Sequence, residues 1–310
     1  MRNSHSLSMQ SVHIVYVVIL NWNGHAGTIE CVKSCLKTSY PRTRVVVVDN
    51  GSSDKSEQLL RTAFPEIDVI QTGANLGFAG GNNVGIRHAL ANAADYVLLL
   101  NNDTIVDPDF ITPLVAAATS DLEAGILCSK IFFHDTPNVI WFAGASFFPT
   151  IGWGRHRGEG QIDHGQFDQP GETGRPTGCA MMVTRKLCET TGLLREEMFC
   201  YAEDLDWGLR ARTAGSKVLY VPTSKVWHKV TRATGGVASP LSQYYTIRNT
   251  LLCLDLNAPL PLPLRGLRYV TAIAPSVIGA IKQRGPKLAR LRAIAKGVWD
   301  YCQNRYGAST

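Results

Sequence analysis

The sequence predicts an α/β fold: a Rossmann-like, mostly parallel central sheet with helices on both faces, followed by a helical C-terminal extension. In the first half of the chain, apolar runs rich in Val, Ile and Leu alternate with helix-like segments. Continuous apolar runs are typical of parallel strands buried on both faces, and helical crossovers between successive strands favour a parallel sheet. Beyond about residue 240 only helix-like segments remain.

The elements of the first half follow one another regularly. Ser53 or Asp54 is expected to cap the second helix, because short polar side chains accept hydrogen bonds from free backbone amides. Strands are predicted at residues 13–20, 44–50, 67–72 and 95–100, and helices at 26–38, 54–63, 80–94 and 108–119.

The pattern is looser in the second half. Residues 144–176 are rich in Gly, Pro, Arg and His and read as loops. Pro222 is expected to end the last strand, because proline cannot donate to a strand ladder. Gly215 is expected just past a helix end, where a left-handed conformation is common. Strands are predicted at 125–133, 178–185 and 216–222, and helices at 203–215 and beyond 240, with a break at 257–264.

The composition indicates a globular protein with a basic tail. Hydrophobic residues make up 45% of the 310 residues and charged residues 18%, which excludes a disordered chain. Residues 240–310 hold ten Lys or Arg against Asp255 and Asp300, so this segment carries +8 and the rest of the chain −2. A basic tail suits an anionic partner, either a phospholipid surface or a nucleic acid. A tail that is merely solvated is the alternative.

Cysteine usage and the apolar runs bear on location. The eight cysteines form no C-x-x-C pair, so reduced thiols in a cytosol are expected rather than disulfides or a zinc site. The apolar runs at 14–20 and 270–281 are too short to span a membrane, and the first lacks a signal-peptide cleavage site. The polar residues 1–11 are expected to be disordered.

Polar clusters follow four successive predicted strands. In open parallel sheets, ligands bind beyond the carboxyl ends of the strands. Turn chemistry explains any one such cluster, because Asn, Asp and Gly all favour turns, but four in succession predict a binding site. The clusters are Asn21–Gly24, Asp49–Gly51, 73–83 and Asn101–Thr104.

Six segments between residues 13 and 250 carry a family resemblance. They read VVILNWNG, VVVVDNGSSD, NLGFAGGNNVGI, LLLNNDTIVDP, FCYAEDLDWGLRAR and YYTIRN. In this order they resemble the family 2 glycosyltransferases, which have the glycosyltransferase-A fold, and most closely the rhamnosyltransferase-like members. The resemblance implies a nucleotide-sugar-binding catalytic domain, placed at 12–239, and the basic composition of the remaining residues indicates a helical extension at 240–310.

The resemblance also implies a reaction and its partners. An inverting enzyme would move a sugar from a nucleotide-diphospho-sugar, with dTDP-rhamnose as the expected donor of L-rhamnose. The acceptor would be a cell-surface polysaccharide or its lipid-linked precursor, that is, a glycan or a polyprenyl-diphosphate-linked sugar. Basic residues around 270–281 suit a helix on an anionic membrane surface. A cytoplasmic protein, peripheral on the inner face of the cytoplasmic membrane, is therefore expected, and no nucleic acid partner.

By resemblance, the nucleotide-sugar donor would lie against the four polar clusters that follow the predicted strands. Asp49 resembles the carboxylate of the family that accepts from the nucleotide base or ribose. Small residues opening a helix favour phosphate, because backbone amides point toward it there; local turn geometry is the alternative. The expected donor-side residues are Asn21, Asn23, Asp49, Asn75, Gly80, Gly81, Asn82, Asn101 and Asn102.

Asp103 is the expected metal ligand. It takes the last place of the D-x-D motif of the family, whose first place holds Asn101 here, so metal affinity can be lower. Hard oxygen ligands suit Mg²⁺ or Mn²⁺. His228 can complete the metal site by resemblance. A helix-capping Asp103 and a structural His228 are the alternatives.

Three acids open the helix predicted at 203–215. By resemblance Asp204 is the expected general base, with Glu203 as the alternate base, and Asp206 can orient the acceptor. Acids at a helix start also complement its dipole, which is the alternative. Trp207 can stack on a sugar or lie in the core, and Arg248 can reach a phosphate or stabilise the fold through an ion pair.

Two other protein classes compete with this interpretation. A nicotinamide-dependent dehydrogenase would need a Gly-rich turn directly after the first strand, and the residues there, Asn21–Gly24, do not supply one. A non-catalytic nucleic-acid-binding protein would use the basic tail alone.

Overall fold

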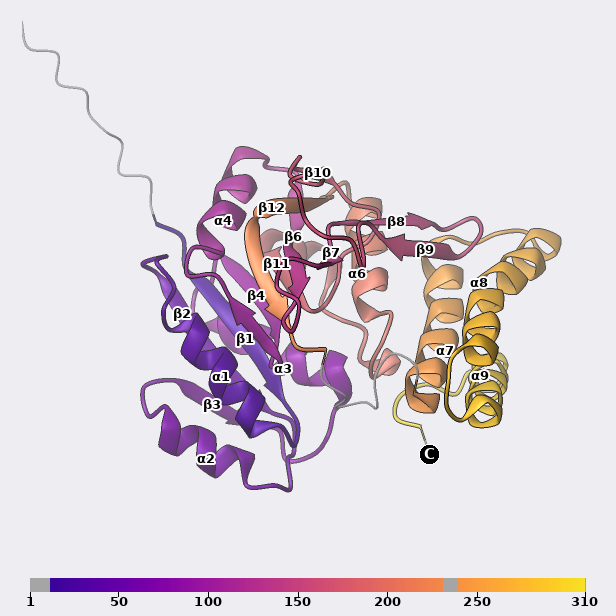
Figure 1. The fold of residues 1–310 in the computed structure, drawn as a ribbon, viewed down its shortest axis with the longest axis horizontal. Helices are drawn as coiled ribbons and strands as arrows, with labels where there is room; N and C mark the ends of the chain where they lie inside the picture. Colours follow the sequence, from indigo (N-terminus) through magenta and orange to yellow (C-terminus); the bar gives the residue numbers. More distant parts are fainter. Residues whose placement is uncertain (1–11, 231–238, 310) are drawn as a thin grey trace, which may run out of the picture.

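The computed structural model describes residues 12–230 and 239–309. Its body is one large sheet with helices packed around it, and three further helices stand beside the body at the C-terminal end (Figure 1). The predicted α/β fold, with a largely parallel central sheet and C-terminal helices, is confirmed. The expected disorder of residues 1–11 lies outside the described residues.

The first half of the chain builds the parallel part of the sheet. The strand order here is β4-β1-β2-β3, and every neighbouring pair is parallel. Apart from the half-buried Leu20, the apolar residues of β1, β2 and β4 are buried, as their continuous runs predict. The elements are β1 (Val15–Asn21), α1 (His25–Cys35), β2 (Thr43–Asp49), α2 (Ser56–Ala63), β3 (Asp68–Gln71), α3 (Gly77–Ala91), β4 (Tyr96–Asn101) and α4 (Ile111–Ser120).

Two helices start differently from the prediction. Helix α2 begins after Lys55, whose φ is +63°, so neither Ser53 nor Asp54 is the cap residue. Asp54 still satisfies one free amide, because its Oδ1 accepts from the backbone N–H of Ser56 at 3.1 Å. Helix α3 begins at Gly77, before the glycine pair that was expected to open it.

The second half adds a mixed part to the sheet. Strand β11 runs antiparallel between β4 and β6, and β12 runs parallel to β6. The expectation of loops over 144–176 is wrong in part, because β8 and β9 form a hairpin there. The elements are β5 (Thr104–Val106), β6 (Ala124–Phe133), β7 (Ile140–Phe142), β8 (Ala145–Phe148), β9 (Trp153–His156), β10 (Gly171–Glu172), β11 (Ala180–Thr184), α5 (Arg185–Thr191), the 3₁₀ helix η1 (Glu196–Met198) and β12 (Lys217–His228).

Pro222 does not end its strand, contrary to the prediction. Strand β12 continues to His228, and its register with β6 shifts between Val221 and Lys225. An irregularity of this kind accommodates a proline, because the residue there need not donate to the ladder. The longer strand carries His228 to a position opposite Thr104 of β5.

The helices predicted at 203–215 and beyond residue 240 are present. Helix α6 (Glu203–Thr213) is followed by Gly215 with a φ of +78°. Helices α7 (Pro240–Asn257), α8 (Leu262–Lys282) and α9 (Lys287–Cys302) follow. Within residues 12–230 and 239–309, no helix is both long and apolar enough to cross a membrane.

A small hydrophobic cluster joins α7 to α6. Leu205 and Leu209 of α6 pack with Met198 against Leu252 and Cys253 of α7. The C-terminal helices therefore support the helix that carries the three predicted acids.

Candidate active site

The strand registers bring the predicted polar clusters to one edge of the sheet. Asn21 lies opposite Asp49, Asp49 lies opposite Gln71, and Leu20 lies opposite Asn101. The clusters that follow β1, β2, β3 and β4 therefore share the carboxyl edge, where ligands of such sheets bind.

Asp49 ties three of these clusters together. It is fully buried, and its Oδ2 accepts from Nδ2 of Asn21 at 2.8 Å. Its Oδ1 accepts from the backbone N–H of Ser52 and from Nε2 of Gln71, each at 2.9 Å. The carboxylate thus fixes the loops after β1 and β2 and the end of β3.

The neighbouring amides also bond to the loops. Oδ1 of Asn23 accepts from the backbone N–H of Ser53 at 2.8 Å. Oδ1 of Asn75 accepts from Nδ2 of Asn50 at 3.0 Å, and Nδ2 of Asn102 donates to Thr28 at 2.9 Å. These bonds give the edge a defined shape before any ligand binds.

Gly80, Gly81 and Asn82 need a correction. They lie within α3 rather than in the loop before it, so they are not the N-terminal turn that would face a phosphate. A Cβ on Gly81 would lie 2.4 Å from Cδ1 of Leu20, so this glycine allows α3 to approach the sheet. Asn82 is buried, and its Nδ2 donates to a backbone carbonyl of the same helix at 2.9 Å.

Asp103 and His228 form a buried pair at the same edge. Nε2 of His228 lies 3.0 Å from Oδ1 of Asp103, and the side chains are 9% and 12% exposed. Burial opposes protonation of the imidazole, but Cys179 and the Asp103 carboxylate beside it raise the pKa of His228 to about 10.

This pair fits a divalent metal only as a two-ligand site. Its carboxylate oxygen and imidazole nitrogen are donors that Mn²⁺ and Mg²⁺ accept, and atoms 3.0 Å apart can contact one ion. Nδ1 of His228 is buried without a hydrogen-bond partner in the described part of the chain. No third His, Cys, Asp or Glu among the described residues completes a metal cluster, so remaining ligands would come from the donor and water.

Asp204 lies at the start of α6 with 12% of its side chain exposed. Its Oδ2 accepts from the backbone N–H of Gly178 at 3.0 Å, and its Oδ1 accepts from that of Leu205 at 2.7 Å. Nη2 of Arg175 lies 3.5 Å from Oδ1. These contacts fix the position of the carboxylate beside the segment that precedes β11.

Asp204 and Asp103 are linked through Gly178 and Cys179, the two residues directly before β11. Asp204 bonds to Gly178, and the next residue, Cys179, accepts from the backbone N–H of Asn101 at 2.9 Å. The charges of His228 and Asp103 both act on the Cys179 thiol. The two acids therefore lie near one another at the carboxyl end of β4.

Glu203 differs from its neighbour. It is 5% exposed, and its Oε2 is buried without a hydrogen-bond partner among the described residues. Burial and the adjacent Asp204 charge raise the pKa of Glu203 to about 8. A carboxyl group that is protonated at neutral pH is a poor general base, which favours Asp204 over the alternate Glu203.

Three predicted acceptor or phosphate residues lie in the interior. Asp206 is fully buried and pairs with Arg195 at 2.9 Å and Arg210 at 2.7 Å. Trp207 is also fully buried, so it offers no face to a sugar. Arg248 is 1% exposed and donates to the backbone carbonyls of Gly307 and Met198. The burial of Trp207 matches the alternative of a core residue, whereas Arg248 makes hydrogen bonds and no ion pair among the described contacts.

The structure adds residues that sequence reasoning missed. Arg175 contacts Asp204 from the segment that reads as loop, and Gly178 contacts it from the first residue of the strand predicted at 178–185. Trp141 of β7 is half-buried and packs edge-on against the His228 ring, with centroids 4.8 Å apart. The three-residue strand around Trp141 is too short to produce a recognisable pattern, so no signal could have found it.

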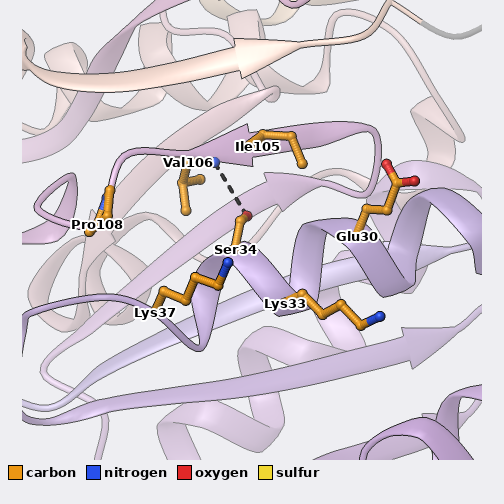
Figure 2. A pocket seen from close by; sticks show the side chains of 7 residues that line it. All are labelled: Glu30, Lys33, Ser34, Lys37, Ile105, Val106 and Pro108. Atoms are coloured by element: carbon orange, nitrogen blue, oxygen red, sulfur yellow. Dashed lines mark hydrogen bonds between the residues drawn. The ribbon is translucent and has the colours of Figure 1, made fainter.

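A separate groove lies between α1 and β5. Figure 2 shows its lining, with Oγ of Ser34 accepting from the backbone N–H of Val106 at 3.3 Å. Its volume is about 450 Å³. Neither Asp103 nor Asp204 lines it; the lining residues are Glu30, Lys33, Ser34, Lys37, Ile105, Val106 and Pro108.

Comparison with known proteins defines the class. Residues 16–192, more than half of the chain, match the model of glycosyl transferase family 2. The protein belongs to this family and is a nucleotide-sugar glycosyltransferase, which leaves the dehydrogenase and the nucleic-acid-binding alternatives without support.

Individual relatives refine the comparison. The chain is 25% identical over 259 residues to the dTDP-rhamnosyl transferase RfbF of Shigella flexneri, covering 81% of this chain and 83% of RfbF. It is 28% identical over 210 residues to the N-acetylglucosaminyl-diphospho-decaprenol L-rhamnosyltransferase of Mycobacterium tuberculosis, covering 62% and 68% of the two chains. The family and these relatives confirm the resemblance to rhamnosyltransferase-like members.

Solved structures agree on the fold. A mannosyltransferase from Pyrobaculum calidifontis, in complex with GDP-Man and Mn²⁺, is similar with a TM-score of 0.59 and 18% identity, covering 94% of this chain and 82% of that one. TarS of S. aureus in complex with UDP-GlcNAc is similar with a TM-score of 0.61 and 17% identity, covering 94% and 81%. The predicted glycosyltransferase-A fold is confirmed.

Proposed function

We propose that this protein transfers L-rhamnose from dTDP-rhamnose to a glycan with inversion at the anomeric carbon. The observation that carries the proposal is the arrangement at the carboxyl edge of the sheet, where Asp204 and the Asp103–His228 pair lie near one another. The rhamnosyltransferases among its relatives support the choice of sugar.

Asp204 acts as the general base in this proposal. Its Oδ2 accepts one backbone N–H and keeps a further lone pair free, whereas its Oδ1 accepts from Leu205 and lies beside Arg175. As the acceptor hydroxyl oxygen attacks the anomeric carbon, its proton passes to Asp204. The bond from that carbon to the diphosphate breaks, and the nucleoside diphosphate leaves. One displacement on the face opposite the leaving group inverts the configuration.

Asp103 and His228 would hold a Mg²⁺ or Mn²⁺ ion, which would neutralise charge on the departing diphosphate. Donor residues would be Asn21, Asn23, Asp49, Asn75, Asn101 and Asn102. Asp49 already accepts three hydrogen bonds from the surrounding loops, so its main role is to shape the nucleotide pocket. A hydrogen bond from the nucleotide would use a remaining lone pair of its carboxylate.

The acceptor proposal is a cell-surface polysaccharide or its polyprenyl-diphosphate-linked precursor. The mycobacterial relative is by its name an enzyme of such a lipid-linked sugar. An enzyme that uses a lipid-linked acceptor must reach a membrane, so this proposal predicts a membrane-facing surface on the protein.

Helix α8 supplies the candidate for that surface. Leu267, Val270, Ile278 and Ile281 are between 49% and 64% exposed and follow helical spacing along one side of α8. The β8–β9 hairpin extends the apolar surface, because Oγ1 of Thr271 donates to the carbonyl of Ile151 at 2.5 Å. Figure 1 shows the hairpin next to α8. Phe148, Ile151 and Trp153 of the hairpin are also exposed.

Exposed cations flank this apolar surface. Lys282, Arg284 and Lys287 lie exposed where α8 ends and α9 begins. Arg268 and Arg290, which the sequence also suggested for this role, are buried and bond within the fold. Apolar side chains beside cations suit the interface of an anionic bilayer. These features support the proposal of a cytoplasmic protein that is peripheral on the inner face of the cytoplasmic membrane.

A thermal-shift panel of nucleotide sugars tests the donor proposal. dTDP-rhamnose should raise the melting temperature more than UDP-GlcNAc or GDP-mannose, because a ligand stabilises the folded state according to its affinity. The product of a successful transfer, analysed by NMR, should have the anomeric configuration opposite to that of the donor. Equal shifts for all three donors would refute the choice of donor, and a retained configuration would refute single displacement.

A further inference from the structure

A strained loop precedes helix α6. Phe199, Tyr201 and Ala202 have positive φ values of 63°, 68° and 67°. Residues with a Cβ rarely adopt this conformation, and it persists only where surrounding contacts fix the backbone. The loop leads directly into Glu203 and Asp204, so the contacts that fix the loop also fix the two acids.

Asn249 of α7 supplies the main contacts. Its Nδ2 lies 2.7 Å from the carbonyl oxygen of Met198, and 2.8 Å from those of Cys200 and Tyr201. The side chain is fully buried. One amide group therefore gathers three carbonyls of the strained turn.

Arg248 sets the orientation of this amide. Its Nε donates to Oδ1 of Asn249 at 2.9 Å, and its Nη2 donates to the Met198 carbonyl at 3.1 Å. A guanidinium can only donate, so Oδ1 must face Arg248 and Nδ2 must face the loop. Arg248 is held in turn by the carbonyl of Gly307 at 2.8 Å.

Tyr245 and α3 hold the loop from two sides. The Tyr245 ring stacks on Phe199 with centroids 5.4 Å apart. The Phe199 carbonyl accepts from the backbone N–H of Ala79 in α3 at 3.0 Å. The loop is thus fixed between α7 and the first turn of α3.

We propose that Tyr245, Arg248 and Asn249, together the α7 clamp, are positioning residues for sugar transfer. They contact neither the donor nor the acceptor, but hold the loop 199–202 and thereby the Asp204 carboxylate. The inference rests on the proposed role of Asp204 as the base. Loosening the α7 clamp should lower kcat and leave nucleotide binding at the β1–β4 edge intact.

Asn249→Asp tests the α7 clamp most directly. The aspartate keeps the shape of the side chain, but it replaces the amide donor with an oxygen that cannot donate to the three carbonyls. With dTDP-L-rhamnose as donor, kcat should fall about 10- to 100-fold, since small displacements of catalytic groups have effects of this size. KM for the donor and the thermal shift with dTDP should stay unchanged. Hydrogen exchange should accelerate at the amides of Ala79 and Asp206, which bond to Phe199 and Ala202.

Matched variants control for simple destabilisation. Arg185→Ala removes an arginine that also donates to two carbonyls, those of Ala94 and Leu90, far from the loop in sequence; its kcat should not change. If Asn249→Asp does not fold, Tyr245→Leu, which loses the stacking on Phe199, should lower kcat. Tyr245→Phe keeps the ring that stacks on Phe199, so its kcat should equal that of the wild-type protein.

Several outcomes would overturn the α7 clamp. The proposal fails if Asn249→Asp has the wild-type kcat, or if its kcat falls no more than that of Arg185→Ala. It also fails if hydrogen exchange at the amides of Ala79 and Asp206 is unchanged in Asn249→Asp. Asp204→Asn, measured in parallel, separates the two proposals: if it transfers normally, the base assignment fails. If it is inactive while Asn249→Asp and Tyr245→Leu transfer normally, only the α7 clamp fails. If the wild-type protein does not use dTDP-L-rhamnose, hydrogen exchange at the amides of Ala79 and Asp206 tests the α7 clamp: faster exchange in Asn249→Asp supports it, and unchanged exchange refutes it.

Discussion

Glu203 and Asp204 are neighbours in the chain, yet their carboxyl groups lie in different surroundings. Asp204 accepts two backbone N–H groups, whereas Oε2 of Glu203 is buried with no partner among the described residues. Burial raises the pKa of Glu203, whereas Asp204 is held by backbone donors, so the two acids can take different roles.

Glu203 predicts a pH dependence of stability. Its pKa is about 8 in the folded protein, above the ordinary value of 4.5. Between these values the folded state keeps a proton that the unfolded state has lost, so the free energy of unfolding falls as pH rises from 5 to 8. Glu203→Gln has no carboxyl group to ionise, so it avoids this loss of stability. The melting temperature of the variant minus that of the wild-type protein should therefore be larger at pH 8 than at pH 5.

Glu189→Gln is the control for this effect, because its carboxylate is 60% exposed. Its melting temperature relative to wild type should not increase over the same range. A Glu203→Gln difference that is the same at both pH values would show that Glu203 ionises normally.

Asp103 and His228 predict a metal dependence. dTDP should stabilise the wild-type protein more in Mn²⁺ than in EDTA, and Asp103→Asn or His228→Ala should weaken the Mn²⁺ effect by about tenfold or more in apparent affinity. Asp68 and His88 form a similar pair at 2.9 Å on the surface, so Asp68→Asn is the matched control. If the Mn²⁺ effect survives in both variants, another site holds the ion.

At the residue scale, the sequence predicted the positions of Asp103 and Asp204 in the fold, but not those of Trp207, Arg248 and Arg175. Asp103 and Asp204 follow from motif position, because strand ends and helix starts can be read from apolar patterns. The interior location of Trp207 and Arg248 could not be read, since a buried and an exposed aromatic or cation look alike in one sequence. Arg175 was missed because its segment has no regular pattern.

At the scale of elements, the long parallel strands were predictable and the short irregular ones were not. Strands β1, β2 and β4 have long apolar runs, whereas β8 and β9 have four residues each and mixed burial. Pro222 misled the prediction of β12 because a bulge absorbs the proline. That bulge allows one strand to carry His228 to Asp103.

Helix α8 predicts binding to anionic vesicles. Leu267→Glu combined with Val270→Glu places two anions on the exposed apolar side, so pelleting with phosphatidylglycerol vesicles should fall about tenfold, as each charge opposes both burial and the surface potential. Leu122→Glu is the matched control, because Leu122 is 82% exposed on the turn between α4 and β6. Equal pelleting of the double variant and the control would refute this surface.

At the scale of the whole molecule, the C-terminal helices are joined closely to the catalytic body. The division of the chain between residues 239 and 240 stays a prediction from composition, and it separates α7 from the loop that Asn249 contacts. Composition reports charge and polarity but not which surfaces pack together, so the sequence could suggest an extension without revealing its contacts.

Truncation after residue 239 should therefore remove activity. Met198, Leu205 and Leu209 would lose their partners on α7, so the fragment should melt at a lower temperature and transfer no sugar. Circular dichroism and a transfer assay measure both effects. A fragment that melts like the full chain and transfers normally would show that α7 is dispensable.

The most direct test of the account is single-turnover sugar transfer by Asp204→Asn. The variant keeps the size of the side chain but cannot take a proton, so the rate should fall about 10²- to 10⁴-fold, while calorimetry finds dTDP binding unchanged. A transfer rate equal to that of the wild-type protein would contradict the assignment of Asp204 and the mechanism built on it.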